Sequence, residues 1–329
     1  MKTKLYLIVS VLIALNACQQ RHPKQLSGDY FGQELSGSEP VLFAPGYVSS
    51  GIYTRDVSIA PDGKSVYFSA SSRGFNFILF TEQVNGVWTE PRIAPFCGTG
   101  NWYDYEPLVS PDGKSILFLS TRPPAGKEPK PGWFYEDIWA VEKTTDGWSQ
   151  PKPLDSSINT DNGEFFPSLT QNGTLYFTRS YADSNRIFRS ERMADAYAVP
   201  EMVSIEGSEH LKYYNAFISP DESYMIACVS GLDSTNNPLY AVAYAKEKGK
   251  FHPFELLPER INRPGQRATA ASVSADGKYL FFASSVPKNP ELSIKPGITQ
   301  TQLFDMLQKP QNGLSDVYWV STEGLIRGQ

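Results

Sequence analysis

Hydrophobic and polar positions alternate along this chain in short runs that are separated by tight turns. The clearest example is residues 105–122, YEPLVSPDGKSILFLSTR, in which two alternating runs flank the segment Ser110-Pro-Asp-Gly113. Pro111 presets the first turn dihedral, and Asp112 and Gly113 tolerate the left-handed conformations that a tight hairpin needs. Both runs have the β-branched and aromatic content of strands. This stretch therefore predicts a β-hairpin.

The same turn recurs five times, at residues 61–63, 111–113, 171–173, 220–222 and 275–277, with spacings of 50, 60, 49 and 55 between the central residues. Each turn is followed by an alternating strand, a third strand, and, in the first four repeats, a proline-containing outer strand. Proline is tolerated there because an edge strand has unpaired amide positions. A β-propeller arranges four-stranded sheets radially, which leaves only short, protected sheet edges, and four strands per repeat fit this arrangement. The sequence thus predicts an all-β fold, a β-propeller.

The two ends of the chain predict the number of blades. The last repeat stops at residues 325–329 without an outer strand of its own. The missing strand is found at the other end, because Glu39-Pro-Val-Leu-Phe-Ala-Pro45 parallels Glu90-Pro-Arg-Ile-Ala-Pro95. We therefore predict a five-bladed β-propeller of four-stranded antiparallel blades, in which the N-terminal strand completes the C-terminal blade. Six blades are a less favoured alternative.

The N-terminus has the features of an export signal. Residues 1–17 combine Lys2 and Lys4 with a short apolar run that is too interrupted for a membrane span. The small residues before Cys18 resemble the bacterial lipobox, which implies lipidation of Cys18, attachment to a membrane through that lipid, and a place in the bacterial cell envelope, with the outer membrane favoured. The alternative is an ordinary cleaved signal peptide.

We divide the rest of the chain into two parts. Residues 18–38 are polar and rich in Gly, Ser and Gln, which is typical of a tether. Residues 39–329 form a single propeller domain with a long insertion at 286–313. Within the insertion, residues 299–308 have the apolar spacing of a short amphipathic helix, which could cap the channel or cover one blade.

Composition narrows the classes of function. Without residues 1–17 the formal charge is 28 − 35 = −7, which makes nucleic acid a poor partner. Cys97 and Cys228 are too few for a disulfide scaffold. The chain has three histidines, no glycine-rich phosphate loop and no His/Cys metal constellation, so we expect no cofactor, no metal and no Ser-His-Asp triad. We also expect a monomer.

The repeat itself resembles a known family. Ser110-Pro-Asp-Gly-Lys114, followed by Phe118-x-Ser-x-Arg122 and Asp137-Ile-Trp139, is similar to the WD40-like (PD40) repeat of TolB-type β-propellers. The resemblance covers roughly residues 39–325, and the third and fourth repeats match least. It implies a scaffold that binds a protein or another ligand. TolB itself carries six blades and a separate N-terminal domain, for which this chain has no room.

A binding site is expected where the innermost strands begin, at one mouth of the central channel. Aromatic rings, carboxylates and guanidinium groups converge there, as in many polar-ligand pockets. The candidate ligand-binding residues are Arg55, Asp56, Arg73, Tyr105, Glu106, Arg122, Glu164, Arg179, Tyr213, Tyr214, Asn215 and Arg267. The structural alternative is that the carboxylates bond backbone amides and the arginines tie blades together.

The leading functional hypothesis is a membrane-anchored, non-enzymatic propeller lipoprotein that binds an envelope protein or a glycan at this mouth. The alternative is a glycoside hydrolase, because several five-bladed glycosidase families place three carboxylates at the starts of successive inner strands. Asp56 would then be the base, Glu164 the acid, and Asp104 or Glu106 would tune the acid. That hypothesis requires the carboxyl groups to face one open cavity, and it fails if Glu164 bonds a turn amide.

Overall fold

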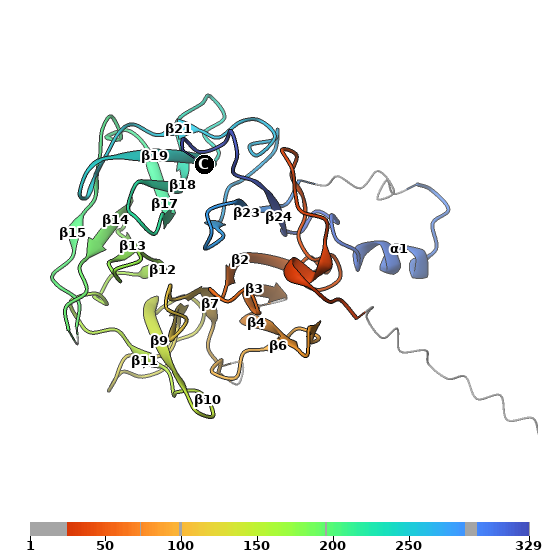
Figure 1. Cartoon of the computed structure of the whole chain (residues 1–329), viewed down its shortest axis with the longest axis horizontal. Helices are drawn as coiled ribbons and strands as arrows, with labels where there is room; N and C mark the ends of the chain where they lie inside the picture. The colour runs from red at the N-terminus through yellow and green to blue at the C-terminus, as the bar shows by residue number, and fades with distance from the viewer. Residues whose placement is uncertain (1–24, 73, 99–100, 195, 287–294, 329) are drawn as a thin grey trace, which may run out of the picture.

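The computed structural model describes residues 25–72, 74–98, 101–194, 196–286 and 295–328. The strands of this part of the chain form five separate sheets that are arranged around a central axis (Figure 1). The five-bladed propeller predicted from the repeats is thus confirmed. Five clusters of buried apolar side chains lie one between each pair of neighbouring blades. The core is therefore a ring of interfaces between sheets.

The blades follow one another in chain order around the ring. Blade one holds β2 (Tyr53–Ile59), β3 (Ser65–Ser72), β4 (Phe75–Val84), β5 (Val87–Trp88) and β6 (Arg92–Ile93). Blade two holds β7 (Asp104–Val109), β8 (Ser115–Ser120), β9 (Asp137–Thr144), β10 (Gly147–Trp148) and β11 (Lys152–Pro153). Blade three holds β12 (Glu164–Leu169), β13 (Leu175–Ser180), β14 (Asn185–Ser190) and β15 (Glu201–Met202).

Blade four holds β16 (Ser204–Ile205), β17 (Lys212–Ile218), β18 (Tyr224–Ser230), β19 (Leu239–Glu247), β20 (Lys250–Phe251) and β21 (Glu255–Leu256). Blade five holds β22 (Ala271–Val273), β23 (Tyr279–Ser284), β24 (Asp316–Ser321) and the N-terminal β1 (Val41–Leu42). In each of the first four blades the third strand pairs with the outer strand that the sequence predicted, namely β6, β11, β15 and β21.

The ring closes as predicted. β1 pairs antiparallel with β24, with Val41 opposite Trp319 and Leu42 opposite Tyr318. The Phe43 amide extends the pairing by donating to the Val317 carbonyl at 2.9 Å. Phe43 itself is fully buried between the first and last blades. The N-terminal strand therefore supplies both the outer edge and part of the core of blade five.

The residues of the repeated turn hold one another. Asp112 Oδ1 accepts hydrogen bonds from the Ser110 hydroxyl at 2.6 Å and from the Lys114 amide at 3.0 Å. The Ser110 hydroxyl oxygen in turn accepts from the Ser115 amide at 3.0 Å. Gly113 has φ = 69°, a left-handed conformation that glycine adopts without steric cost. These contacts explain why the motif repeats Ser, Asp and Gly at fixed positions.

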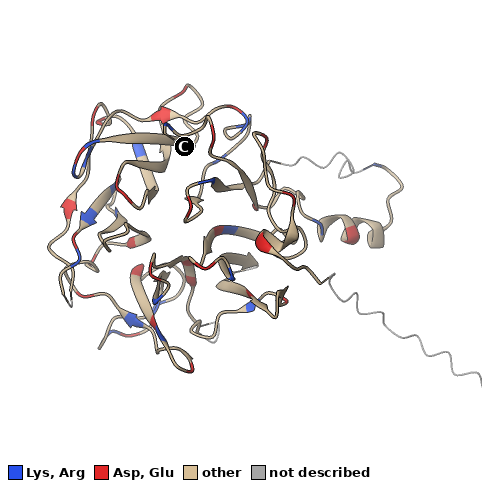
Figure 2. Cartoon of the chain, in the orientation of Figure 1, with Lys and Arg blue, Asp and Glu red and all other residues tan. Residues whose placement is uncertain are grey.

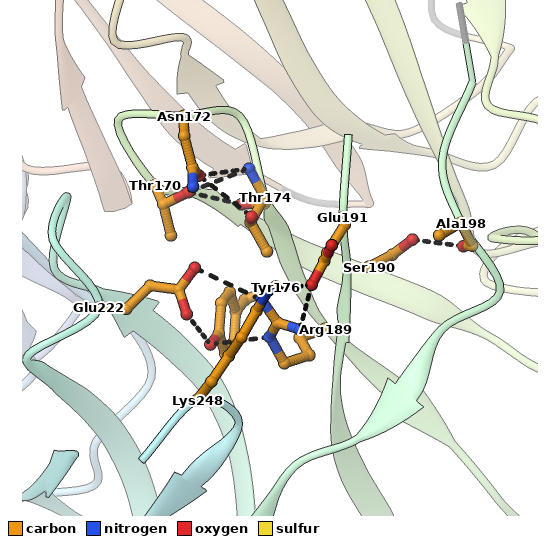
Figure 3. A network of polar contacts seen from close by, with 10 residues as sticks. All are labelled: Thr170, Asn172, Thr174, Tyr176, Arg189, Ser190, Glu191, Ala198, Glu222 and Lys248. Atoms are coloured by element: carbon orange, nitrogen blue, oxygen red, sulfur yellow. Dashed lines mark hydrogen bonds and ion pairs between the residues drawn. The ribbon is translucent and has the colours of Figure 1, made fainter. Parts of the chain in front are cut away.

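In blade four Glu222 takes the place of that glycine and still adopts φ = 61°. Its carboxylate accepts a hydrogen bond from Tyr176 at 3.1 Å and pairs with Arg189 at 3.5 Å, both in blade three (Figure 3). Arg189 also pairs with Glu191, which in turn pairs with Lys248 of blade four. The strained turn residue therefore belongs to a polar network that joins two blades.

Residues 25–38 pack against the propeller, which corrects the prediction that residues 18–38 are a tether throughout. Residues 29–32 form a short 3-10 helix (η1, Asp29–Gly32), and Phe31 is 2% exposed with its ring stacked on Trp88 at 4.2 Å. Tyr30 packs against Tyr279 and Trp319 at 5.4 and 5.2 Å. This segment escaped prediction because its few aromatic residues stand in a polar context. Residues 18–24, like the expected signal peptide and Cys18, lie outside the described residues.

The predicted helix of the insertion is α1 (Gln300–Leu307), which begins with a capping box between Thr299 and Gln302. In Figure 1 it lies beyond the outer edge of blade five, away from the central channel. The helix thus does not cap the channel, which was one of the two roles expected for it. Residues 287–294 of the insertion lie outside the described residues. Within the described ranges, no helix has the length and apolar content to cross a membrane.

Candidate functional site

Each of the first four inner strands contains the same irregularity. The pairing register shifts between Arg55 and Ser58 in β2, and at the matching points of β7, β12 and β17. The residues at the shift have left-handed backbones with φ between 52° and 56°; they are Asp56, Glu106, Phe166 and Asn215. Such bulges re-aim side chains and are common near functional sites. Here they direct four matching side chains toward the channel.

The mouth of the channel, on the face where the inner strands begin, is hollowed. This mouth hollow has a volume of about 540 Å³. Besides Ser71 and Leu119, aromatic rings, amides and two carboxylates around one guanidinium line it. They are Tyr53, Tyr105, Trp133, Phe165, Tyr214, Asn76, Asn185, Asn215, Glu106, Glu136 and Arg55. A hollow of this size and make-up is typical of a site for a small polar ligand.

Two aromatic rings of the hollow, Trp133 and Tyr105, are in contact, and Trp133 also packs against Tyr103 beside the hollow. Trp133 lies 6.1 Å from Tyr105 at an interplanar angle of 75°, and 4.9 Å from Tyr103. The Arg55 guanidinium lies 5.0 Å from the centre of the Tyr105 ring. Trp133 is 45% exposed, so much of its ring remains free for a ligand.

A buried charge cluster forms the floor of the hollow. Arg55 Nε bonds Asp56 Oδ2 at 2.8 Å, and the other end of the guanidinium pairs with Glu106. The second Glu106 oxygen accepts from the Phe166 amide at 2.8 Å.

Burial raises the pKa of Glu106 to about 8; the nearby charge of Asp56 raises this pKa further, and Arg55 opposes the shift. Burial also raises the pKa of Asp56. One guanidinium thus serves two carboxyl groups, which favours retention of a proton between them.

A second cavity lies below this cluster, on the face that carries the Pro-Asp-Gly turns. It has a volume of about 130 Å³ and is lined largely by apolar side chains, among them Pro61, Pro111, Pro220 and Leu169. Glu106 borders both cavities, whereas Asp56 borders the one on the turn face. The charge cluster therefore lies between the two halves of the channel.

The other two carboxylates of the hydrolase hypothesis are engaged elsewhere. Glu164 is fully buried and accepts from the Thr160 amide at 2.8 Å, the Thr160 hydroxyl at 2.7 Å and Arg179 Nε at 2.6 Å. Asp104 accepts from the Gly98 amide at 2.7 Å and pairs with Arg122 at 2.5 Å. Because Glu164 accepts from the Thr160 amide, it is not available for the role of catalytic acid that the hydrolase hypothesis gave it.

Arg122 and Arg179 act in parallel ways. Besides its carboxylate, Arg122 bonds the Phe96 carbonyl at 2.9 Å, and Arg179 bonds the Ile158 carbonyl at 2.9 Å. Both carbonyls belong to the segments that lead from one blade to the next. The two arginines therefore hold blade connections, as the structural alternative proposed, and neither lines the mouth hollow.

The structure separates the remaining candidates. Tyr214 lines the hollow and donates to the Ala268 carbonyl at 3.3 Å, whereas Tyr213 is buried between blades against Phe254. Asn215 bonds the Thr269 carbonyl at 2.6 Å, and its Oδ1 is buried without a hydrogen-bond partner. Arg267 is exposed and bonds Asn237 at 3.2 Å, outside the hollow. Arg73 lies outside the described residues.

Eight described residues of the hollow were not among the candidates: Tyr53, Ser71, Asn76, Leu119, Trp133, Glu136, Phe165 and Asn185. Trp133 and Glu136 belong to the 121–136 loop between β8 and β9, on the mouth face. The spacing of 60 residues in blade two was the available signal for that loop. Burial raises the pKa of Glu136, so a second carboxyl of perturbed acidity borders the cavity.

Metal and thiol chemistry find no support in the described ranges. No group of three or more His, Cys, Asp or Glu side chains there could hold a metal ion. Cys97 and Cys228 are both free, and burial raises the pKa of the Cys97 thiol to about 12. Such thiols are poor nucleophiles at neutral pH.

No protein-family model matches the chain, and no curated protein sequence matches it. Among solved structures it resembles TolB from Acinetobacter baumannii, with 16% identity and a TM-score of 0.46, over 71% of this chain and 49% of that one. This chain thus spans about half the length of that TolB. It also resembles the GH43 endo-arabinanase from Bacillus licheniformis, with 12% identity and a TM-score of 0.50, over 84% and 96% of the two chains. Identities this low show a shared propeller fold alone.

Proposed function

We propose that this protein is a binding module of the bacterial envelope whose mouth hollow binds a neutral glycan. The observation that carries the proposal is the composition of the hollow, in which aromatic rings and side-chain amides line one cavity. Sugar rings present apolar C–H faces surrounded by hydroxyl groups. Aromatic faces such as that of Trp133 can cover the former, and amides such as Asn76 and Asn185 can bond the latter.

The charges of the hollow favour a neutral ligand. Arg55 is the one Lys or Arg among the described lining residues, and Asp56 and Glu106 already pair with it. Elsewhere, positive and negative segments are interspersed around the ring (Figure 2). An anionic ligand would find no free cation at the floor, and a ligand carrying hydroxyl groups needs none.

A glycan array tests the proposal with the mature chain and two variants. Trp133→Ala should lower the affinity for the bound glycans at least about tenfold, as truncation of a central aromatic contact does. Phe134→Ala is the matched control, because Phe134 is the adjacent residue, is 65% exposed and does not line the hollow. We expect this variant to bind like the wild type.

Two outcomes would contradict the glycan proposal. In the first, glycans bind but Trp133→Ala and Phe134→Ala behave alike, so the site lies elsewhere. In the second, no glycan binds, while an envelope protein is captured by the wild type and lost with Trp133→Ala. The hollow would then serve a protein partner.

Attachment to the membrane is part of the same proposal and rests on the lipobox-like residues before Cys18. Metabolic labelling with palmitate tests it. The wild type should incorporate the label and fractionate with membranes, and Cys18→Ala should do neither. Labelling that persists in Cys18→Ala would rule out lipidation at that residue.

Glycan hydrolysis is a second candidate, favoured by one observation. Glu106 and Glu136 both border the hollow, and burial raises the pKa of each. A carboxyl with a raised pKa can act as a general acid. Incubating each array-selected glycan with wild type and Glu136→Gln decides between the candidates. Turnover that the variant loses would establish an enzyme, and intact glycan with both proteins would leave a binding module.

A further inference from the structure

A second pocket lies on the mouth face beside the hollow, over the edge between blades one and two. This outer pocket has a volume of about 330 Å³. Its lining includes Phe75, Asn76, Ile93, Trp102 and Tyr103. Phe75 is 56% exposed and Ile93 is 52% exposed, so the pocket presents apolar side chains to solvent.

The two cavities adjoin each other at Asn76. Asn76 lines both of them, and no described residue hydrogen-bonds its side-chain amide. Aromatic contacts run along the same path: Tyr105 lies in the hollow, Trp133 packs against it, and Tyr103 of the outer pocket also packs against Trp133, at 4.9 Å. The path therefore offers ring faces at successive positions, with the Asn76 amide at the junction.

We infer that the ligand is a linear oligosaccharide that occupies both cavities, with one end at the channel mouth and the other on the outer pocket. This inference rests on the proposed function and specifies its ligand. An extended chain of sugars repeats an apolar face and a set of hydroxyls at each unit, which matches repeated rings joined by an amide. A single sugar would leave the outer rings of Phe75 and Trp102 uncovered.

Charge in the outer pocket points to the same class of ligand. Asp104 is its one charged residue among those described, and it is neutralised by Arg122 at 2.5 Å and bonded by the Gly98 amide. Among the described lining residues, neither cavity thus has an unpaired cation for a sulfated or carboxylated glycan. The oligosaccharide is therefore neutral along its whole bound length.

Titration with oligomers of increasing length tests this inference. The probes are the monosaccharide and the two- to six-unit oligomers of the neutral glycan that binds best on the array. For the wild type, affinity should rise at least about tenfold from the shortest oligomer that binds to the longest, because further units reach the outer pocket. Phe75→Ala should abolish most of that rise and leave the short oligomers unchanged.

Val84→Ala is the matched control, since Val84 stands at the other end of the same strand β4 and is 51% exposed. It should keep the wild-type dependence on length. The inference is overturned if affinity does not depend on length, or if Phe75→Ala weakens short and long oligomers equally. Either result leaves glycan binding at the mouth intact, whereas failure of every neutral glycan to bind the wild type removes the proposed function as well as this inference.

Discussion

Single residues in unusual backbone conformations decide what the channel presents. The sequence places Asp56 and Glu106 near the mouth, but it does not show that both stand at a bulge with left-handed φ. Because a bulge adds one residue to one strand, it changes which side chains face the channel. Alternation alone predicts similar places for Asp104, Glu106 and Glu164. In the structure Glu106 reaches the floor of the hollow, while the other two bond turns.

The pKa of Glu106 predicts how stability depends on pH. The folded protein holds a proton on Glu106 up to about pH 8, whereas the unfolded chain releases it near the ordinary glutamate value. The free energy of unfolding should therefore be highest below the ordinary value and fall as pH rises, by up to about 1.4 kcal/mol per pH unit, until pH passes 8. Urea unfolding between about pH 5 and 9 measures this slope.

Glu106→Gln should make the slope shallower, most clearly between about pH 6 and 8, because glutamine does not titrate and burial raises the pKa of Asp137 and of Asp316 only to about 6. Glu323→Gln changes an exposed glutamate and should retain the wild-type slope. If the wild type and Glu106→Gln lose stability in parallel, the proton is not held by the charge cluster.

At the scale of elements, the repeated turns and strands were predictable because their chemistry is local. Ser110, Asp112 and Gly113 bond or fold within a few residues of one another, so a short motif suffices to recognise them. The proline-containing outer strands were likewise confirmed. The 121–136 loop, which delivers Trp133, was not recognised as part of the site, because its position depends on contacts with Tyr103 and Tyr105.

Glu222 permits a test of how a degenerate turn is stabilised. Glu222→Ala keeps the left-handed strain but removes the contacts with Tyr176 and Arg189, and should lower the free energy of unfolding by about 1–3 kcal/mol. Glu222→Gly removes the same contacts and relieves the strain, so it should recover about 1 kcal/mol of that loss. Denaturant unfolding of the three proteins gives both differences. Equal stability of the alanine and glycine variants would show that the turn carries no strain.

At the scale of the whole molecule, closure of the ring was predictable from the parallel between the two ends of the chain. The packing of residues 25–38 was not, because Phe31 and Tyr30 gain their partners from Trp88, Tyr279 and Trp319, which are distant in sequence. A polar segment with two aromatic residues has the composition of a linker until those partners are known. The N-terminal segment thus belongs to the folded domain.

Phe31→Ala tests this correction. Removing the buried ring should cost about 3 kcal/mol or more, as other buried phenylalanines do. Leu35→Ala is the control from the same segment, because Leu35 is 59% exposed, and its stability should change by less than about 0.5 kcal/mol. If thermal or denaturant unfolding gives the same small change in stability for both variants, the segment is a tether, as first predicted.

The central claim is that the mouth hollow is the binding site, and a crystal structure of the mature protein with an array-selected glycan tests it most directly. The account predicts a sugar ring in the hollow, with its C–H face on Trp133 or Tyr105 and its hydroxyls bonded by Asn76 or Asn185. Ordered sugar in the apolar cavity on the turn face, with the mouth hollow empty at a saturating glycan concentration, would contradict it.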